Sequence, residues 1–149
     1  MGPPRRAVYG RGVLSPRLAA MVDALPLAPG MRVLEIGCGP GAAARAVAVR
    51  VDPGHVLAID RSATAVRQAT AAGATEIAAG RLRVRRVAVE ELALEPGEGP
   101  YDLAFAVRVG VLDGRHPALE QRALARIAAA LRAGGRLVVD GREVPLPRG

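Results

Sequence analysis

The chain has 149 residues and a mass of 15.4 kDa, a size that suits one domain and excludes two. Hydrophobic residues make up 50% of it, so we expect a packed globule, and its one cysteine, Cys38, excludes an internal disulfide or a cysteine zinc cluster. The 21 basic residues are all arginine and exceed the 14 acidic residues, which gives a net charge of +7.

The basic charge raises the question of an anionic partner. The arginines are dispersed apart from a cluster at residues 81–86, and the few aromatic residues offer little for base stacking, so we expect no nucleic-acid partner. No apolar stretch is long enough to cross a bilayer, and no apolar segment follows the basic N-terminus. We therefore expect a cytoplasmic protein with no membrane partner.

In chain order, residues 1–14 are rich in proline, arginine and glycine and predict a flexible N-terminal arm. Ser15 and Pro16 then begin a helix, as N-cap and first helical residue. Five strand-like runs follow, at residues 32–36, 56–60, 82–87, 101–107 and 136–140. Helical segments lie between most of them, at residues 41–50, 62–70, 74–79 and from Pro117 to a glycine stop at residues 134–135.

This alternation of strands and helices predicts one domain over residues 15–140, of the α/β class. Most of the runs are apolar throughout, as expected of parallel strands that are covered on both faces. The fold is therefore a doubly wound, Rossmann-like, mainly parallel sheet with helices on both faces. Residues 141–149 hold two prolines and predict a C-terminal tail.

The sharpest feature is VLEIGCGPG at residues 33–41, in which a strand carrying Glu35 passes into a glycine loop that opens a helix. Glycine lets a ligand touch the main chain, and the amides at the start of a helix face an anionic group. Asp60 stands at the end of the second strand, where an acid accepts hydrogen bonds from both hydroxyls of a ribose.

Three interpretations of this loop compete. Gly37, Gly39 and Ala42 satisfy the dinucleotide fingerprint, but the Glu35 carboxylate would repel a pyrophosphate and suits a ligand with a cationic amino group, such as S-adenosylmethionine. A nicotinamide-dependent reductase would also lack its Tyr-x-x-x-Lys pair, because the chain has no lysine. In the third interpretation the glycines only form a strand–helix turn, and Asp60 caps the next helix.

The sequence resembles the class I S-adenosylmethionine-dependent methyltransferase family. Residues 33–41 are similar to its first motif, and VLAIDRS at 56–62 to its second strand with the ribose-binding acid. YDLAFAV at 101–107 and LRAGGRLVVD at 131–140 resemble its fourth and fifth strands. The resemblance covers nearly the whole chain and implies S-adenosylmethionine as cofactor, S-adenosylhomocysteine as product and a strand order of 3-2-1-4-5.

The resemblance also implies which residues bind the cofactor. The methionyl part would lie against the first motif and the end of the fourth strand, and the ribose and adenine against the residues after the second and third strands. At the position where the family often has an adenine-binding aspartate this chain has Ala88, so a neighbouring amide or acid would substitute. The implied set is Glu35, Gly37, Cys38, Gly39, Gly41, Asp60, Arg61, Val89, Glu90, Ala106 and Val107.

The acceptor is less well defined, because methyl transfer relies mainly on proximity and orientation and needs a general base only when the acceptor loses a proton. The loop after the fourth strand holds the candidate catalytic residues Arg108, Asp113 and His116. Each also has a structural interpretation: Arg108 braces a loop, Asp113 forms a turn, and His116 caps the helix that begins at Pro117. The sequence contains no cluster of carboxylates that would predict a metal site.

We expect an enzyme, a methyltransferase that acts on a small molecule, with an anionic acceptor as one option. The alternative is a non-catalytic binding or regulatory subunit on the same fold, because the family's last two strands are missing and no residue is a convincing base. The fifth strand would then leave an open edge, covered by the tail, by a second copy in a homodimer, or by a partner protein. Arginines 81, 83 and 85 on the opposite edge predict charge protection of that edge.

Overall fold

A computed structural model of the protein describes residues 8–9 and 12–147. The predicted arm at residues 1–14 falls largely outside the described residues. Its described parts are β1 (Val8–Tyr9) and β2 (Gly12–Val13), which pair antiparallel as a separate small sheet. The flexibility of the arm and the domain limits at residues 14 and 140 stay predictions.

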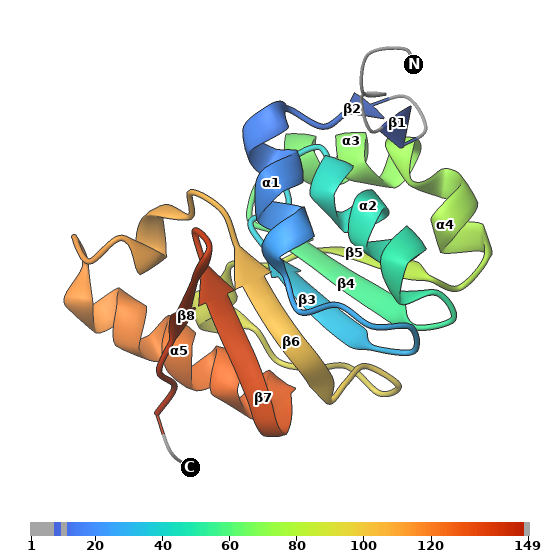
Figure 1. Ribbon diagram of the computed structural model, residues 1–149. Helices are drawn as coiled ribbons and strands as arrows, with labels where there is room; N and C mark the ends of the chain where they lie inside the picture. Colours follow the sequence, from blue (N-terminus) through green and yellow to red (C-terminus); the bar gives the residue numbers. More distant parts are fainter. Residues whose placement is uncertain (1–7, 10–11, 148–149) are drawn as a thin grey trace.

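A single main sheet of six strands organises the rest of the described chain (Figure 1). Its order is β5-β4-β3-β6-β7-β8, and every neighbouring pair is parallel except β7 and β8. The five parallel strands therefore have the expected order 3-2-1-4-5, and the fold class is confirmed. The strand bounds are β3 (Arg32–Ile36), β4 (His55–Asp60), β5 (Leu82–Arg86), β6 (Tyr101–Ala106), β7 (Leu131–Val139) and β8 (Arg142–Val144).

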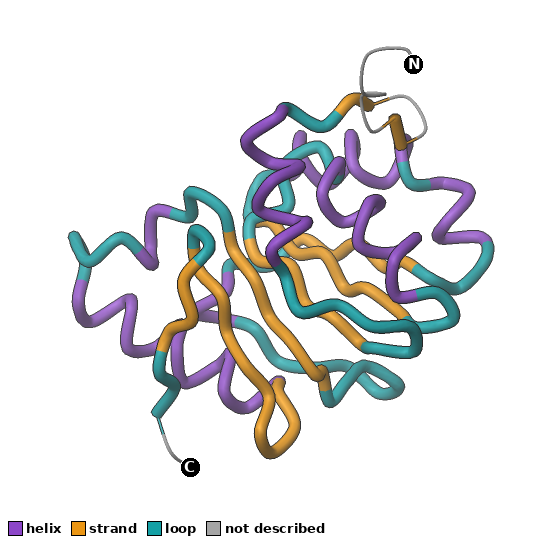
Figure 2. The backbone as a smooth tube through the Cα atoms, in the orientation of Figure 1, coloured by secondary structure: helices purple, strands orange, loops and turns teal. Residues whose placement is uncertain are grey.

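Helices cover the two faces of this sheet (Figures 1 and 2). The first four lie toward one face, and α5 packs on the other beside the short turn η1 (Val89–Glu91). A second short turn, η2 (Gly110–Leu112), precedes α5. The helices are α1 (Pro16–Ala24), α2 (Ala42–Val51), α3 (Ala63–Ala72), α4 (Ala74–Ala78) and α5 (Pro117–Ala130).

Side chains that alternate along the central strands fill two apolar layers. Val33 and Phe105 pack with α1 and α2 on one face, whereas Leu34 and Ile36 pack with α5 on the other. All four are at most 1% exposed. Burial on both faces explains why these strands are continuous apolar runs.

The predicted caps are present at two helices. Ser15 Oγ accepts a hydrogen bond from Leu18 N at 3.2 Å, and Ser62 Oγ accepts one from Ala65 N at 3.2 Å. The cap of α2 is Gly41, whose φ of +89° is a conformation that a side chain disfavours. A Cβ at this position would also lie 3.0 Å from Ala69 Cβ in α3, so glycine allows the two helices to approach.

The end of α5 corrects the predicted stop at residues 134–135. The helix ends at Ala130, and Leu131 pairs with Tyr101 as the first residue of β7. Leu131 is only 9% exposed, so its burial in the sheet takes it out of the helix. The register then shifts before Leu103 pairs with Arg136, and Gly134, with φ of +78°, lies in this irregular part of β7.

At the edge beside β7, the structure shows one of the three expected coverings, the tail. The tail returns as β8, and Leu137, Val138 and Val139 pair with Val144, Glu143 and Arg142. Val144 and Leu146 pack against the α5-side core. The tail itself thus supplies one antiparallel strand, and a homodimer or partner protein at this edge stays a prediction.

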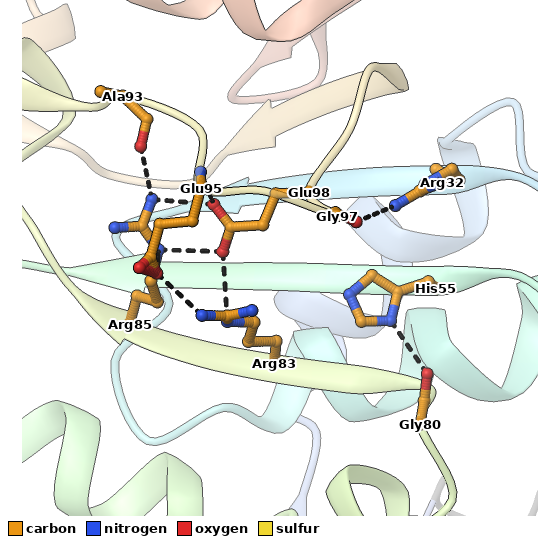
Figure 3. Close-up of polar contacts among 9 residues, drawn as sticks. All are labelled: Arg32, His55, Gly80, Arg83, Arg85, Ala93, Glu95, Gly97 and Glu98. Carbon is orange, nitrogen blue, oxygen red and sulfur yellow. Dashed lines mark hydrogen bonds and ion pairs between the residues drawn. The ribbon is translucent and has the colours of Figure 1, made fainter.

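At the opposite edge, the clustered arginines are held in ion pairs. Glu98, with its side chain 2% exposed, lies between Arg83 and Arg85 in Figure 3, at 3.2 and 3.0 Å from their Nε atoms. Glu95 lies 2.8 Å from Arg83 Nη2, and Arg81 pairs with Asp52 at 2.9 Å. The pairs of Glu95 and Glu98 connect the loop before β6 to β5. Together with the Arg81 pair, they neutralise much of the local positive charge within the fold.

Among the described residues, none of the helices is both long and apolar enough to cross a membrane. The same residues contain no group of three or more histidine, cysteine, aspartate or glutamate side chains placed to hold a metal ion.

Candidate functional site

A cavity of about 570 Å³ lies at the carboxyl ends of the central strands, where ligands bind in sheets of this kind. Ile36 and Gly37 after β3 and Asp60 and Arg61 after β4 line its centre. The remaining wall comes from residues 87–90 after β5, residues 108–111 after β6, and the start of α5. Its volume is in the range of about 300–1,000 Å³ that small-molecule sites have.

The glycine loop turns sharply beside this cavity. Gly37, Gly39 and Gly41 have φ of +67°, +54° and +89°, all in the left-handed region. A Cβ at Gly37 would lie 2.7 Å from Val109 Cγ2, so the loop passes directly under the Val109 side chain. A Cβ at Gly39 would meet nothing within 4 Å, which leaves the main chain there accessible.

Asp60 joins the two predicted motifs. Its Oδ2 accepts a hydrogen bond from Gly39 N at 2.9 Å, and its Oδ1 accepts one from Ser62 N at 2.9 Å. Each carboxylate oxygen has a second lone pair, so Asp60 can still accept hydrogen bonds from a ligand in the cavity that it lines.

Glu35 lies beneath the loop rather than in the cavity wall. It is 3% exposed, and its Oε1 is buried without a hydrogen-bond partner among the described residues. Burial raises the pKa of Glu35 to about 8; a hydrogen bond from the Ala44 backbone opposes this rise, and the Asp60 charge adds to it. Direct contact of Glu35 with a ligand stays a prediction.

Cys38 is a structural loop residue in this geometry. Its main-chain nitrogen donates to Ile59 O at 2.9 Å, and its Sγ lies 3.5 Å from Gly39 O. Burial, then the charges of Glu35 and Asp60, raise the pKa of the Cys38 thiol to about 12. The thiol therefore stays protonated and is a poor nucleophile. Neither Cys38 nor the neighbouring Gly39 and Gly41 is part of the cavity wall.

The end of β6 holds the two predicted residues Ala106 and Val107. They line a separate small hollow of about 10 Å³ beside α1, not the large cavity. The chain then turns at Arg108, whose φ of +55° is unusual for a side chain other than glycine. Arg108 N donates to Asp140 Oδ1 at 2.8 Å, which holds this turn against the end of β7.

The three catalytic candidates are placed differently. Arg108 and His116 line the cavity, and His116 is at the N-cap position of α5 with no hydrogen bond from its side chain to the helix. Asp113 is outside the wall and accepts bonds from Arg115 N at 3.0 Å and Arg115 Nε at 2.6 Å. These bonds lower the pKa of Asp113, so it is a poor general base.

Residues 87–90 form the wall beside β5. Val89 and Glu90, both predicted to bind the cofactor, line the cavity, and Ala88 lines it at the position of the family's aspartate. Val89 is 5% exposed and packs with the α5-side core. Glu90 is thus the acidic side chain available at this end of the cavity.

Sequence reasoning did not predict several of the wall residues, among them Ile36, Ile59, Val109, Val111 and Leu119. Leu119 illustrates why. Its helical spacing predicts an inward side chain, yet Leu119 is 39% exposed because it faces the cavity, and Ala123 and Ile127 fill the core instead. Apolar periodicity does not distinguish a core from a cavity wall.

Comparisons with known sequences identify relatives. A family model described as a methyltransferase domain matches residues 33–135. Nocamycin O-methyltransferase of Saccharothrix syringae is 36% identical over 128 residues, covering 85% of this chain and 43% of that protein. Trans-aconitate 2-methyltransferase of Paracidovorax citrulli is 32% identical over 130 residues, covering 83% and 45%. The chain thus spans less than half the length of these two relatives.

Solved structures share the fold. A geranyl diphosphate methyltransferase in complex with its diphosphate and sinefungin superposes with a TM-score of 0.67 at 19% identity, over 83% of this chain and 43% of that one. A cyclase superposes with a TM-score of 0.64 at 25% identity, over 81% of this chain and 42% of that one. The second match shows that the fold alone does not specify the reaction.

Proposed function

The chain belongs to the methyltransferase-domain family, and we propose that it transfers a methyl group from S-adenosylmethionine to a small-molecule acceptor. One observation carries the proposal: the acid at the end of β4 is bonded to the glycine loop after β3, and both border one cavity. The two motifs that the cofactor requires are therefore assembled at a single site.

The residues present fit this cofactor. Asp60 has lone pairs available for ribose hydroxyls, and the glycine loop borders the cavity at Gly37, where the methionyl part would lie. Ile36, Ile59 and Val89 give the wall apolar surface on which an adenine ring can pack. Glu90 would accept a hydrogen bond from the adenine amino group in place of the missing aspartate at position 88.

When bound, the cofactor supplies a methyl group on a positively charged sulfur, which is a good leaving group. The chain's contribution is then to hold the reactants in line and to exclude water. Asp60 and the glycine loop fix one partner, and residues 108–111 and the start of α5 form the wall against which an acceptor would lie. No described group needs to move a proton unless the acceptor carries one.

Support for a small acceptor comes from the size of the site and from two relatives. The cavity of about 570 Å³ is part of one domain. The relatives are named for nocamycin and trans-aconitate, both small molecules. The fold itself does not require methyl transfer, since a cyclase shares it, and a non-catalytic binding or regulatory subunit is the alternative.

The test is methyl transfer by the purified chain. Labelled S-adenosylmethionine is incubated with a protein-free small-molecule extract of cells, and S-adenosylhomocysteine and labelled products are followed by chromatography and mass spectrometry. The proposal expects equal amounts of both products, lost in Asp60→Ala and retained in the surface variant Asp23→Asn. Cofactor binding without any labelled product would favour the non-catalytic alternative.

A further inference from the structure

The wall beside β6 and α5 is cationic, in contrast to the wall beside β4 and β5. Arg108, Arg115 and His116 line the first part, and Asp60 and Glu90 line the second. Arg61 is the basic residue on the second side. One end of the cavity therefore has both acidic and basic side chains, which suits the cofactor. The other end has basic side chains, and the acceptor would lie there.

Arg108 is a cation that the fold leaves available at the end of the cavity beside β6 and α5. Within the part of the chain that the structure describes, its guanidinium has no hydrogen bond or ion pair, whereas Arg115 is bonded to Asp113 at 2.6 Å. Most other arginines near the sheet edges are paired, as Arg83 is with Glu95 and Glu98. An unpaired guanidinium at a cavity wall is a site for an anion.

The backbone at Arg108 has an energetically unfavourable conformation, which determines the direction of the side chain after the end of β6. A φ of +55° is in the left-handed region, which costs a residue other than glycine about 1–2 kcal/mol. The 2.8 Å hydrogen bond from Arg108 N to Asp140 Oδ1 holds it there. Strain that the surrounding structure maintains in this way is concentrated at functional sites.

The chemistry of the positive end favours a carboxylate. The planar guanidinium matches a carboxylate with two parallel hydrogen bonds. A carboxylate is already ionised at neutral pH, so its methylation needs no base, and Asp113 is committed to Arg115. Two charge-assisted hydrogen bonds from Arg108 withdraw electron density from the carboxylate that accepts them and make its oxygens poorer nucleophiles, so the reacting oxygen belongs to a second carboxylate of the same molecule.

We propose that the acceptor is a small organic acid with at least two carboxylates, one bound by Arg108 and the other methylated. An oxygen lone pair of the second carboxylate forms the bond to the methyl carbon as the methyl–sulfur bond breaks, and that bond's electron pair stays on sulfur. No proton is transferred, and the product is a methyl ester. This inference rests on the proposed function, because it names the acceptor class of the same site.

Binding is tested first, by NMR on ¹⁵N-labelled protein saturated with S-adenosylhomocysteine. Succinate and citrate are titrated, with the neutral succinamide and inorganic phosphate as comparisons. The acids should shift the Arg108 Nε–H resonance, which is assigned by its absence in Arg108→Gln, and should bind about tenfold more tightly than phosphate or succinamide. In Arg108→Gln their affinity should fall about tenfold, and in the matched surface variant Arg67→Gln it should not change.

Product chemistry is tested second. Labelled product formed from an acidic acceptor should release volatile methanol in alkali, as a methyl ester does. The inference is overturned if neither acid binds, if phosphate or succinamide binds equally well, if Arg108→Gln has no effect, or if the label is stable to alkali. Failure of the proposed function looks different, because S-adenosylhomocysteine itself would then not bind or no acceptor of any charge would be methylated.

Discussion

Asp60 Oδ2 accepts a hydrogen bond of 2.9 Å from the main-chain nitrogen of Gly39. The bond joins the turn after β3 to the end of β4, so the glycine loop and the acid form one unit. Asp60 Oδ1 is held in turn by Ser62 N, at the cap of α3. A site that is preformed in this way loses little conformational freedom when a ligand binds.

Gly37→Ala should damage the site through a defined contact. The new Cβ would lie 2.7 Å from Val109 Cγ2, and the residue would have to keep φ at +67°. Overpacking of this kind costs about 1–3 kcal/mol, so urea denaturation should show a lower free energy of unfolding, and cofactor affinity should fall.

The control for this prediction is Gly30→Ala, where φ is +89° but a Cβ meets nothing within 4 Å. It should show only the backbone penalty of about 1–2 kcal/mol, with cofactor affinity unchanged. Adding Val109→Ala to Gly37→Ala should restore part of the lost stability. If Gly37→Ala lowered the free energy of unfolding equally in the natural chain and in the Val109→Ala variant, the predicted contact would be contradicted.

Glu35 should make stability depend on pH. Its pKa is about 8 in the folded protein, against an ordinary value of 4.5, so the folded state retains a proton that the unfolded state releases between these values. The free energy of unfolding of the ligand-free protein should therefore fall as pH rises across this window, by up to about 1.4 kcal/mol per pH unit. Above the folded pKa this dependence should end.

Glu35→Gln is the matched variant, because it keeps the shape of the side chain and removes the titration. The difference in free energy of unfolding between the variant and the natural protein should change with pH in the direction stated, as measured by urea denaturation at several pH values. A difference that is constant from about pH 5 to pH 8 would show that Glu35 is ionised in the folded protein.

Glu98→Gln should weaken the attachment of the loop before β6 to the edge strand β5. The Glu98 side chain is 2% exposed and lies 3.0 Å from Arg85 Nε, and Arg85 is 18% exposed and also pairs with Glu95, so we expect a loss of about 1–3 kcal/mol, the cost of leaving a buried hydrogen-bonding group unsatisfied. The control Glu143→Gln removes an exposed pair with Arg136, which is worth at most about 1 kcal/mol. If urea denaturation gave similar losses of unfolding free energy in the two variants, Glu98 would contribute no more to stability than an exposed charge does.

The strands, helix starts and motifs were predictable because they depend on local pattern, whereas the strand order was predicted from the family resemblance. The apolar runs predict buried parallel strands, and the structure confirms them in β3, β4 and β6; β7 is parallel to β6, but only its Leu131 and Leu137 are buried. Ser15 and Ser62 predict helix starts, and both hydroxyls form the cap bonds. These signals lie within a few residues of each other, so tertiary contacts seldom override them.

Features that depend on distant contacts were not predictable. The early end of α5 follows from the pairing of Leu131 with Tyr101. The tail was one of three predicted coverings of the edge beside β7, but the sequence did not indicate that it would pair there as the strand β8. The cavity wall at Val109 and Val111 depends on how the loop after β6 folds over Gly37. No spacing in the sequence encodes that approach.

The central claim is that Asp60 and the glycine loop bind S-adenosylmethionine, and calorimetric titration with S-adenosylhomocysteine tests it most directly. The account predicts saturable binding to the natural chain and a loss of at least about tenfold in Asp60→Ala, since hydrogen bonds to a charged group contribute about 1.5–3 kcal/mol. Asp23→Asn, an exposed acid paired with Arg50, should bind normally. No heat of binding at millimolar ligand, or an unchanged affinity in Asp60→Ala, would contradict the claim.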